Sequence, residues 1–196
     1  MEKIDLIQSA RRGDLEAFNC LVLASQDTIF QHAIWMLGES EAAEDVTQAT
    51  FLLAYRNFHS FQDEDLYCWL LRIANRLCLK ELRWRERAKT FAHSALSNGS
   101  GGIKSANHVA GFIDDSRGSL AHKDLKKIVL ESLMELSPFL RAVLTLVDIQ
   151  GMNYNQTSII LGTSERSVKS HLARARLRMS ELIFAKASQE EQSFCG

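Results

Sequence analysis

The sequence predicts an all-α protein with two small helical domains joined by a linker, and three observations support this. The chain of 196 residues contains one proline, Pro138, and ten glycines, which are the residues that helix interiors exclude. With 46% hydrophobic and 24% charged residues, its composition is typical of a folded globular protein. Apolar residues recur at helical spacing in two regions, and a stretch without this periodicity separates them.

The first region, residues 1–89, has the pattern of a four-helix bundle, because its apolar periods are separated only by short connections. Glycines follow the first two periods and an aspartate precedes the second, as expected at helix ends and at a helix start. The expected elements are a helix ending at Gly13, a helix capped by Asp14 that ends at Gly38, a helix beginning near Glu41, a loop over 59–67 and a helix over 68–89.

Residues 90–121 are predicted to be a linker. They hold five of the ten glycines and many serines, and their apolar residues follow no helical period. Two alternatives remain for this segment: a plain flexible tether, or a segment whose scattered apolar side chains lie against a partner protein.

The second region, residues 122–186, is predicted to contain a helix-turn-helix. Its first helix carries an apolar stripe, and Ser137 followed by Pro138 is typical of the start of the next helix. The remaining elements are a stop at Gly151, a short helix over 153–161, a turn at Gly162, a longer helix and a tail over 187–196.

The last helix separates an apolar face from a face of basic and hydroxyl-bearing residues. Val168 and Leu172 belong to the apolar face, which spans an arc of about 60°. Ser164 is the expected N-cap, so the polar face begins in the first turn, where recognition helices meet base edges in the major groove. The alternative is a solvated basic helix end, which accounts for Arg176 and Arg178 but not for the first two turns. The candidate DNA contacts are Arg166, Ser167, Lys169, Ser170, His171 and Arg174.

The helix over 68–89 carries a continuous basic stripe. Its basic residues fall within an arc of about 80° and along about 22 Å of the helix axis, so they can neutralise successive phosphates. Aromatic residues in and before this helix, such as Phe61 and Trp69, can stack on unpaired bases. The alternative is that these rings pack inside the bundle. The stripe consists of Arg72, Arg76, Lys80, Arg83 and Arg87.

The helix that begins near Glu41 is a candidate protein interface. Val46 and Leu53 are among the residues expected to face inward, which leaves an acid, an amide and a leucine on other faces: Asp45, Gln48 and Leu52. Acidic residues near a helix start and single exposed leucines are common. An ordinary solvated face is therefore the alternative.

Other kinds of site are not indicated. The cysteines, Cys20, Cys68, Cys78 and Cys195, have no C-x-x-C pair or histidine at metal-ligand spacing, so we expect reduced thiols, no metal and no cofactor. Known catalytic motifs are missing, and no catalytic residue is expected. No apolar run is long enough to span a membrane, which predicts a cytoplasmic protein without membrane insertion. The net charge of −1 argues against nucleic acid, but the basic residues are concentrated on two helices.

In order and spacing these elements resemble a bacterial RNA polymerase sigma factor of the sigma-70 family, extracytoplasmic-function group. The segments "GESEAAEDVTQATFLLAYRNFHSF" and "YCWLLRIANRLCLKELR" look like region 2 of that family, and residues 133–179 look like region 4. The resemblance covers residues 4–90 and 123–184 but not the linker.

The resemblance implies core RNA polymerase and promoter DNA as partners, with an anti-sigma factor as a further one. Docking on the clamp helices of the largest polymerase subunit falls to Asp45, Gln48 and Leu52. The last helix, with the six candidates given above, reads the upstream (minus-thirty-five) promoter element. The linker threads the polymerase near its active-site and RNA-exit channels. The downstream (minus-ten) element is opened and read by Phe61, Trp69, Arg72, Asn75, Arg76, Lys80 and Arg83.

The chain departs from the family pattern at several of these positions. Ala49 replaces an acid, which alters one expected polymerase contact, and Arg76 and Lys80 replace an asparagine and an acid, which alters the expected downstream base preference. Thr157 and Ser158 replace Ile-Ala in the first helix of the helix-turn-helix and are expected to soften that helix. His171 replaces an arginine, which weakens one expected phosphate contact at neutral pH.

A two-domain helix-turn-helix regulator that does not bind polymerase is the alternative function. Such a regulator needs only the last helix, together with a dimer interface or ligand pocket that the sequence does not reveal. An adaptor of the helical-bundle kind would need neither basic helix. The sigma-factor interpretation accounts for both basic helices and for the candidate protein interface.

Overall fold

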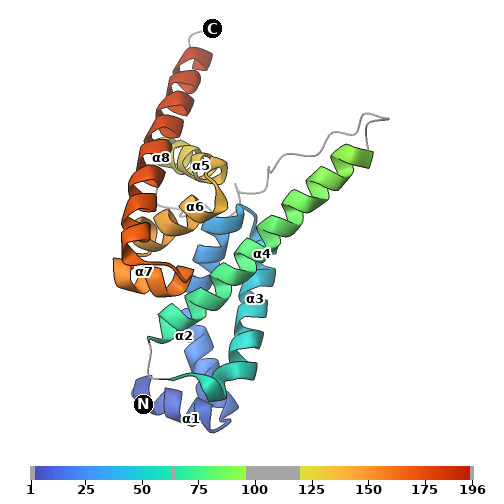
Figure 1. Cartoon of the computed structure of the whole chain (residues 1–196), viewed down its shortest axis with the longest axis vertical. Helices are drawn as coiled ribbons and strands as arrows, with labels where there is room; N and C mark the ends of the chain where they lie inside the picture. The colour runs from blue at the N-terminus through green and yellow to red at the C-terminus, as the bar shows by residue number, and fades with distance from the viewer. Residues whose placement is uncertain (1–2, 63–64, 96–119, 195–196) are drawn as a thin grey trace.

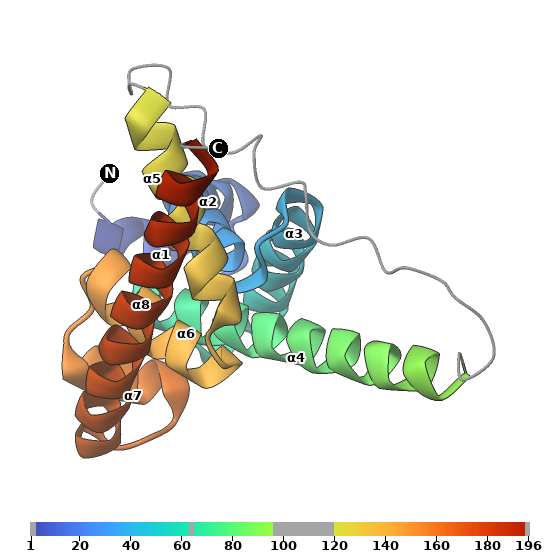
Figure 2. The same cartoon turned by 90° about the horizontal axis from the view of Figure 1, so that it is seen from above.

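The computed structural model describes residues 3–62, 65–95 and 120–194, and every regular element within these ranges is helical. Helices α1 to α4 form an N-terminal half and α5 to α8 a C-terminal half (Figure 1). The predicted all-α fold is confirmed. Figure 2 shows that the C-terminal part of α4 projects beyond the other helices.

Local signals set the helix ends of the N-terminal half. The Asp14 carboxylate accepts hydrogen bonds from the backbone N–H groups of Glu16 and Ala17, at 3.0 and 3.1 Å, and thus caps α2 as predicted. The next connection turns at Gly38, whose φ of 75° lies in the left-handed region that glycine adopts without strain. The four helices are α1 (Lys3–Arg11), α2 (Leu15–Leu37), α3 (Ser40–Asn57) and α4 (Leu66–Ala95).

A cluster of aromatic rings joins α2, the short helix η1 (Phe58–Ser60) and the start of α4. The centroid of the Phe58 ring lies 5.2 Å from that of Phe18, 5.4 Å from that of Phe61 and 5.8 Å from that of Trp69. These four rings are buried. They hold the loop that precedes α4 against the bundle.

The C-terminal half contains the predicted helix-turn-helix. Pro138 occupies the start of α6, and the chain turns at Gly151 and Gly162, whose φ angles are 69° and 65°. Asn153 and Gln156 form a reciprocal capping box at the start of α7. The elements are α5 (Leu120–Glu135), α6 (Pro138–Leu144), a π-helical turn η3 (Thr145–Ile149), α7 (Tyr154–Leu161) and α8 (Glu165–Phe194).

The two halves share a hydrophobic core. Leu146 and Ile160 pack into the same cluster as buried residues of α2 and α4, and Ala142 belongs to a second cluster that is otherwise formed by α2, α3 and α4. Gly38 lies against Met134, because a Cβ at residue 38 would stand 2.7 Å from the Met134 sulfur. Helix α7 thus lies on α4, as Figure 1 also shows.

The structure differs from the sequence expectations at several places. Helices α4 and α5 begin at Leu66 and Leu120, inside the predicted loop and the predicted linker. Helix α4 continues to Ala95, beyond the predicted linker start at residue 90, because no glycine or proline interrupts residues 90–95. Leu53, expected to face inward, is 37% exposed. Residues 187–194 continue α8 rather than forming a separate tail. The rest of the predicted linker, 96–119, lies outside the described residues.

Candidate functional site

The last helix presents its predicted polar face to solvent. Val168 and Leu172 are 0% and 2% exposed and pack with Val143 of α6. The Ser164 hydroxyl accepts a hydrogen bond from the backbone N–H of Ser167 at 3.2 Å, which confirms the predicted N-cap. Of the DNA candidates, four are exposed and two are half-buried: Arg166, Lys169, Ser170 and Arg174, then Ser167 and His171.

Helix α7 contributes contacts to this face that the sequence reasoning missed. The Lys169 ammonium lies 5.3 Å from the centroid of the Tyr154 ring, within the range of a cation–π contact. The Asn155 side chain donates a hydrogen bond to the Glu165 carboxylate at 3.2 Å. Both contacts join the first turn of α7 to the first turns of α8. The signal for them was the short Gly162 turn, which joins the end of α7 to the start of α8, together with the shortness of α7, which keeps its first turn near α8.

An ion pair joins η3 to α8 about two turns beyond Lys169. The Arg176 guanidinium donates two hydrogen bonds to the Asp148 carboxylate of η3, at 2.9 and 2.6 Å, and this bond raises the pKa of Arg176. Arg176 is therefore occupied within the protein, which agrees with its position outside the predicted DNA face.

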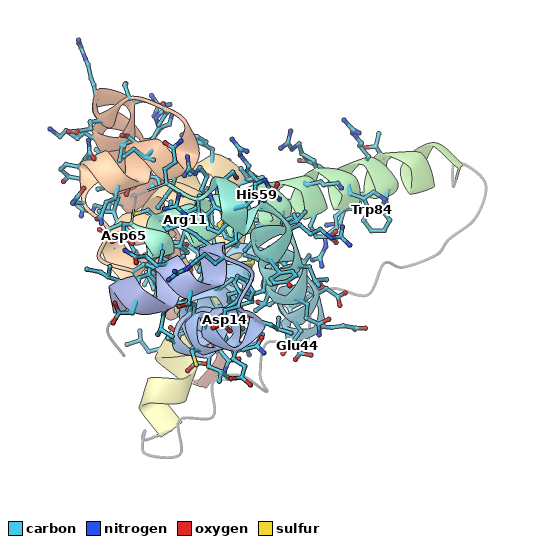
Figure 3. The ribbon with its side chains drawn as sticks, turned by 90° about the horizontal axis from the view of Figure 1, so that it is seen from below. Arg11, Asp14, Glu44, His59, Asp65 and Trp84 are labelled. Atoms are coloured by element: carbon cyan, nitrogen blue, oxygen red, sulfur yellow. The ribbon has the colours of Figure 1, made fainter. Side chains whose placement is uncertain are left out.

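The basic stripe of α4 lies along the projecting part of the helix. Arg76, Lys80, Arg83 and Arg87 are exposed and Arg72 is half-buried. Figure 3 shows several nitrogen-tipped side chains here, near the labelled Trp84. The Arg85 side chain instead bonds the Glu81 and Glu39 carboxylates at 2.8 and 2.9 Å. The stripe therefore keeps a single charge sign on one face of the helix.

Three of the predicted downstream contacts are buried. Phe61 and Trp69 belong to the aromatic cluster, with ring centroids 5.1 Å apart, and Asn75 is 2% exposed. In this arrangement their side chains do not reach the surface. Direct DNA contacts by these three residues remain predictions, and they require local rearrangement of the packing described here.

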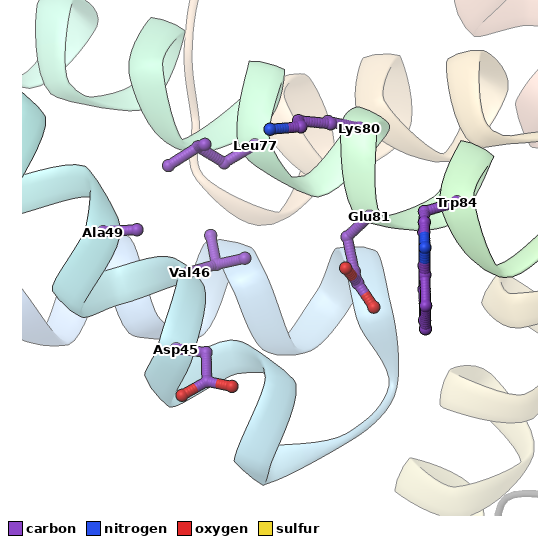
Figure 4. Close-up of a pocket in the computed structure, with 7 residues that line it drawn as sticks. All are labelled: Asp45, Val46, Ala49, Leu77, Lys80, Glu81 and Trp84. Carbon is purple, nitrogen blue, oxygen red and sulfur yellow. The ribbon is translucent and has the colours of Figure 1, made fainter.

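The predicted polymerase-binding residues share one face of α3. Asp45, Gln48 and Leu52 are exposed, and they fall within an arc of about 60°. Beside them, α3 and α4 form a pocket of about 400 Å³, which includes Asp45 and the 65%-exposed Trp84. In Figure 4 the Trp84 ring stands next to Glu81 at one end of this pocket. Trp84 was not predicted as a surface residue of this site, because it lies between Arg83 and Arg85 in a segment whose clearest pattern is its basic charge.

The cysteines of the described residues do not form a site. Cys68 and Cys78 are buried and Cys20 is exposed, all three as free thiols, while Cys195 lies outside the described residues. No group of three or more metal-ligating side chains occurs within the described residues. None of the helices there is long and apolar enough to cross a membrane.

Comparison with known proteins identifies both halves. Residues 21–88 match the family model of sigma-70 region 2, and residues 126–179 match that of sigma-70 region 4. The RNA polymerase sigma-H factor of Pseudomonas aeruginosa is 27% identical over 172 residues, covering 87% of this chain and 88% of that protein. The ECF RNA polymerase sigma-E factor of Escherichia coli is 28% identical over 180 residues, with the same two shares covered.

Solved structures share the fold. The sigma factor RpoE of Bartonella quintana, in complex with the anti-sigma factor NepR, has a TM-score of 0.65 and 26% identity, covering 86% of this chain and 98% of that chain. CnrH, in complex with the cytosolic domain of CnrY, has a TM-score of 0.66 and 23% identity, covering 93% of this chain and 97% of that chain. With both sigma-70 regions present in order, and with these relatives, the chain belongs to the extracytoplasmic-function group of the sigma-70 family of RNA polymerase sigma factors.

Proposed function

We propose that this sigma factor binds core RNA polymerase and directs promoter recognition, DNA opening and the start of transcription at a signal-responsive set of promoters. The observation that carries the proposal is the presence, in one chain, of two outward basic surfaces and one outward acidic surface on separate helices: α4, α8 and α3. The protein itself supplies no catalysis in this scheme. Bond formation belongs to the polymerase.

The upstream element is assigned to the polar face of α8. Exposed arginines can bond guanine in the major groove, and lysine and serine can contact phosphates or bases. Burial of Val168 and Leu172 supports this orientation, because it directs Arg166, Ser170 and Arg174 away from the protein.

The downstream element is assigned to the basic stripe of α4. Its exposed charges, including Arg76, Lys80 and Arg83, suit the backbone of duplex or strand-separated DNA. Phe61 and Trp69 are buried in the aromatic cluster that packs the loop before α4 against the bundle. Either ring must therefore leave the cluster before it can contact DNA directly.

Polymerase docking is assigned to the face of α3 that carries Asp45, Gln48 and Leu52. An exposed leucine flanked by a carboxylate and an amide suits an interface with an apolar centre and a polar rim. Because two similar structures are complexes with an anti-sigma factor or with a cytosolic domain of a second protein, we also assign an anti-sigma factor to this protein as a regulatory partner.

Copurification with core RNA polymerase tests the proposal against a regulator that acts without polymerase. The full chain should bind purified core enzyme in a stoichiometric complex and should then retain a promoter fragment that core enzyme alone releases. A chain that binds the promoter but never the core enzyme would support the regulator instead.

A further inference from the structure

A buried polar cluster lies where the two halves meet, and the functions assigned above do not use it. His32 of α2 is 0% exposed, and Asn75 of α4 is 2% exposed. Gln150, which follows η3, donates a hydrogen bond from its side-chain nitrogen to the Thr28 carbonyl of α2 at 3.3 Å. One turn separates Thr28 from His32, so Gln150 reaches from the C-terminal half to the imidazole.

The polar atoms of this cluster are poorly partnered. Both ring nitrogens of His32, the Asn75 side-chain oxygen and the Gln150 side-chain oxygen are buried without a well-formed hydrogen bond. Burial lowers the pKa of His32 from 6.5 to about 4, although the nearby Asn75 and Gln150 amides favour the protonated ring. This packing therefore requires the His32 ring to be in its neutral form.

A second polar contact crosses the same interface. The Arg141 guanidinium of α6 is buried and donates hydrogen bonds to the backbone carbonyls of Met36 in α2 and of Met134 and Leu136 in its own half. Burial lowers the pKa of Arg141 to about 10, so this group stays charged at neutral pH. A proton on His32 would thus add a second buried cation to the interface.

Charged groups on the surrounding helices do not offset that cation. Helix α7 has no charged residue, and the Asp148 carboxylate of η3 is bonded to Arg176. Among the carboxylates whose side chains the structure describes, those of α1, α3 and α5 are exposed to solvent: Asp5, Glu41, Glu44, Asp45, Glu131 and Glu135. Glu16 and Asp27 of α2 and Glu86 of α4 are exposed as well, and the Glu81 carboxylate of α4 is bonded to Arg85. The basic groups on α1, α3, α5 and the adjoining turns of α4 whose side chains the structure describes are Arg11, Arg56, Arg72, Arg76 and Lys127.

The packed arrangement also conflicts with simultaneous binding of both promoter elements. Elements centred about 10 and 35 positions upstream are about 85 Å apart, at 3.4 Å per base pair. Helix α7 packs on α4, and the recognition face begins at Arg166, so the two basic surfaces lie within roughly a few tens of ångströms of each other. The halves must separate before both surfaces can bind one promoter.

We propose that His32, Asn75 and Gln150 form a pH-sensitive latch that holds the two halves together, and that protonation of the His32 ring releases them. The promoter-reading consequence rests on the function proposed above, whereas the latch itself is a property of the free chain. In the closed chain the basic surfaces of α4 and α8 are too close together to reach both promoter elements at once. In the open chain they can move far enough apart to do so.

The sign and size of the pH effect follow from proton linkage. The ring binds a proton less readily in the closed chain than in the open chain, so the closed chain is fully favoured above about pH 6.5 and loses stability as the pH falls towards 4. With these two pKa values, the ratio of open to closed chain rises about tenfold between about pH 7.5 and about pH 5.5.

Hydrogen exchange of the free full-length chain tests the latch without polymerase or DNA. After correction for the intrinsic exchange rate, amides of α7 should exchange about tenfold faster at about pH 5.5 than at about pH 7.5, while the buried turns of α8 around Leu172 stay protected. Helical circular dichroism should stay unchanged over the same range.

Three variants separate the latch from general acid sensitivity. His32→Leu should remove the pH dependence and leave the chain closed. Gln150→Ala, which removes only the contact from the C-terminal half, should raise α7 exchange at both pH values. Gln31→Ala, at an exposed amide beside His32, should behave as wild type.

Two results would overturn the latch. In the first, the exchange rate of α7 amides in the wild-type chain does not change between the two pH values. In the second, that rate changes as much in His32→Leu as in the wild type. If His32→Leu does not fold, Gln150→Ala decides: exchange equal to that of Gln31→Ala would refute the latch. Binding to core polymerase at about pH 7.5 is measured separately. Failure of that binding would refute the proposed function and leave the latch result intact.

Discussion

At the residue scale, a hydrogen bond to the Ser167 carbonyl sets the tautomer of His171. Its Nδ1 lies 2.7 Å from the Ser167 carbonyl oxygen, which only accepts hydrogen bonds, so Nδ1 carries the hydrogen. The ring also packs edge-on against Phe139, with centroids 4.8 Å apart. In the neutral ring Nε2 is therefore a hydrogen-bond acceptor, which cannot bond a phosphate oxygen.

Replacing His171 with arginine should strengthen binding to a duplex that contains only the upstream element. A permanent charge would neutralise one more phosphate, so the slope of log K against log salt should become steeper by about 0.9. Fluorescence anisotropy over a salt series measures this slope. His59→Arg adds the same charge at an exposed position on η1, and an equal change there would show that net charge alone accounts for the effect.

Arg141 is the residue whose loss should most affect packing between the halves. Arg141→Leu would leave the Met36, Met134 and Leu136 carbonyls without their donor, and unpaired buried acceptors are costly. We expect a loss of about 2–4 kcal/mol in the free energy of unfolding, measured by urea denaturation. Asp148→Ala breaks a largely exposed pair and should cost less than about 1 kcal/mol. Similar losses in the two variants would contradict the structural role of Arg141.

At the element scale, the two exposed faces of the N-terminal half differ in charge: α3 presents an acidic face and α4 presents a basic stripe. Helix α3 turns Val46 and Thr50 into the core and leaves Asp45, Gln48 and Leu52 outside. Helix α4 turns Leu71 and Ala74 inward and leaves its stripe outside. Each helix therefore has one buried face and one face available to a partner.

The outward face of α3 predicts a charge-reversal effect on polymerase binding. Asp45→Arg should weaken core binding at least tenfold, about 1.4 kcal/mol, with thermal stability unchanged because the side chain is exposed. Asp27→Arg makes the same reversal on an exposed position of α2. Core affinity unchanged in a folded Asp45→Arg protein would remove this face from the interface.

The stripe of α4 predicts a salt effect on downstream DNA. Lys80→Ala with Arg83→Ala removes two phosphate contacts, so the salt slope for single-stranded downstream DNA should fall by about 1.4. Lys89 lies on the same helix about 140° from the middle of the stripe, which makes Lys89→Ala the matched control. Equal slopes for the double variant and for this control would show that the stripe does not bind DNA.

Element ends were predictable from the sequence because their causes are local. Asp14, Gly38 and Ser164 each act within a few residues of their own position, and the sequence displays such signals directly. The apolar face of α8 followed from periodicity alone. Leu53 was predicted wrongly, because periodicity does not reveal that α3 leaves part of its apolar face uncovered.

At the scale of the whole molecule, the contact between the halves was not predictable. Arg141 and Met36 are 105 residues apart, and Gln150 and Thr28 are 122 apart; no local pattern encodes such pairs. The same packing and the aromatic cluster bury Asn75, Phe61 and Trp69, which the sequence placed among the DNA contacts. Residue type and spacing indicated the binding surfaces, whereas their exposure depended on the tertiary fold.

In the proposed function, one chain both binds polymerase and reads the two promoter elements. Neither half alone supplies both proposed promoter surfaces, since the stripe is on α4 and the proposed recognition face is on α8. A variant that changes only one surface should therefore lose transcription while it retains core binding. Arg166→Ala together with Arg174→Ala on α8 is such a variant, because both residues are exposed and lie on a different helix from the face proposed to dock on polymerase.

Run-off transcription with purified core RNA polymerase measures whether this chain directs promoter-specific initiation. On a promoter selected by the holoenzyme from a random library, addition of the wild-type chain should give a transcript of defined length, and core enzyme alone should give none. The α8 double variant should bind core enzyme normally yet reduce this transcript at least tenfold, about 1.4 kcal/mol. A wild-type chain that binds core enzyme but produces no promoter-specific transcript would contradict the account.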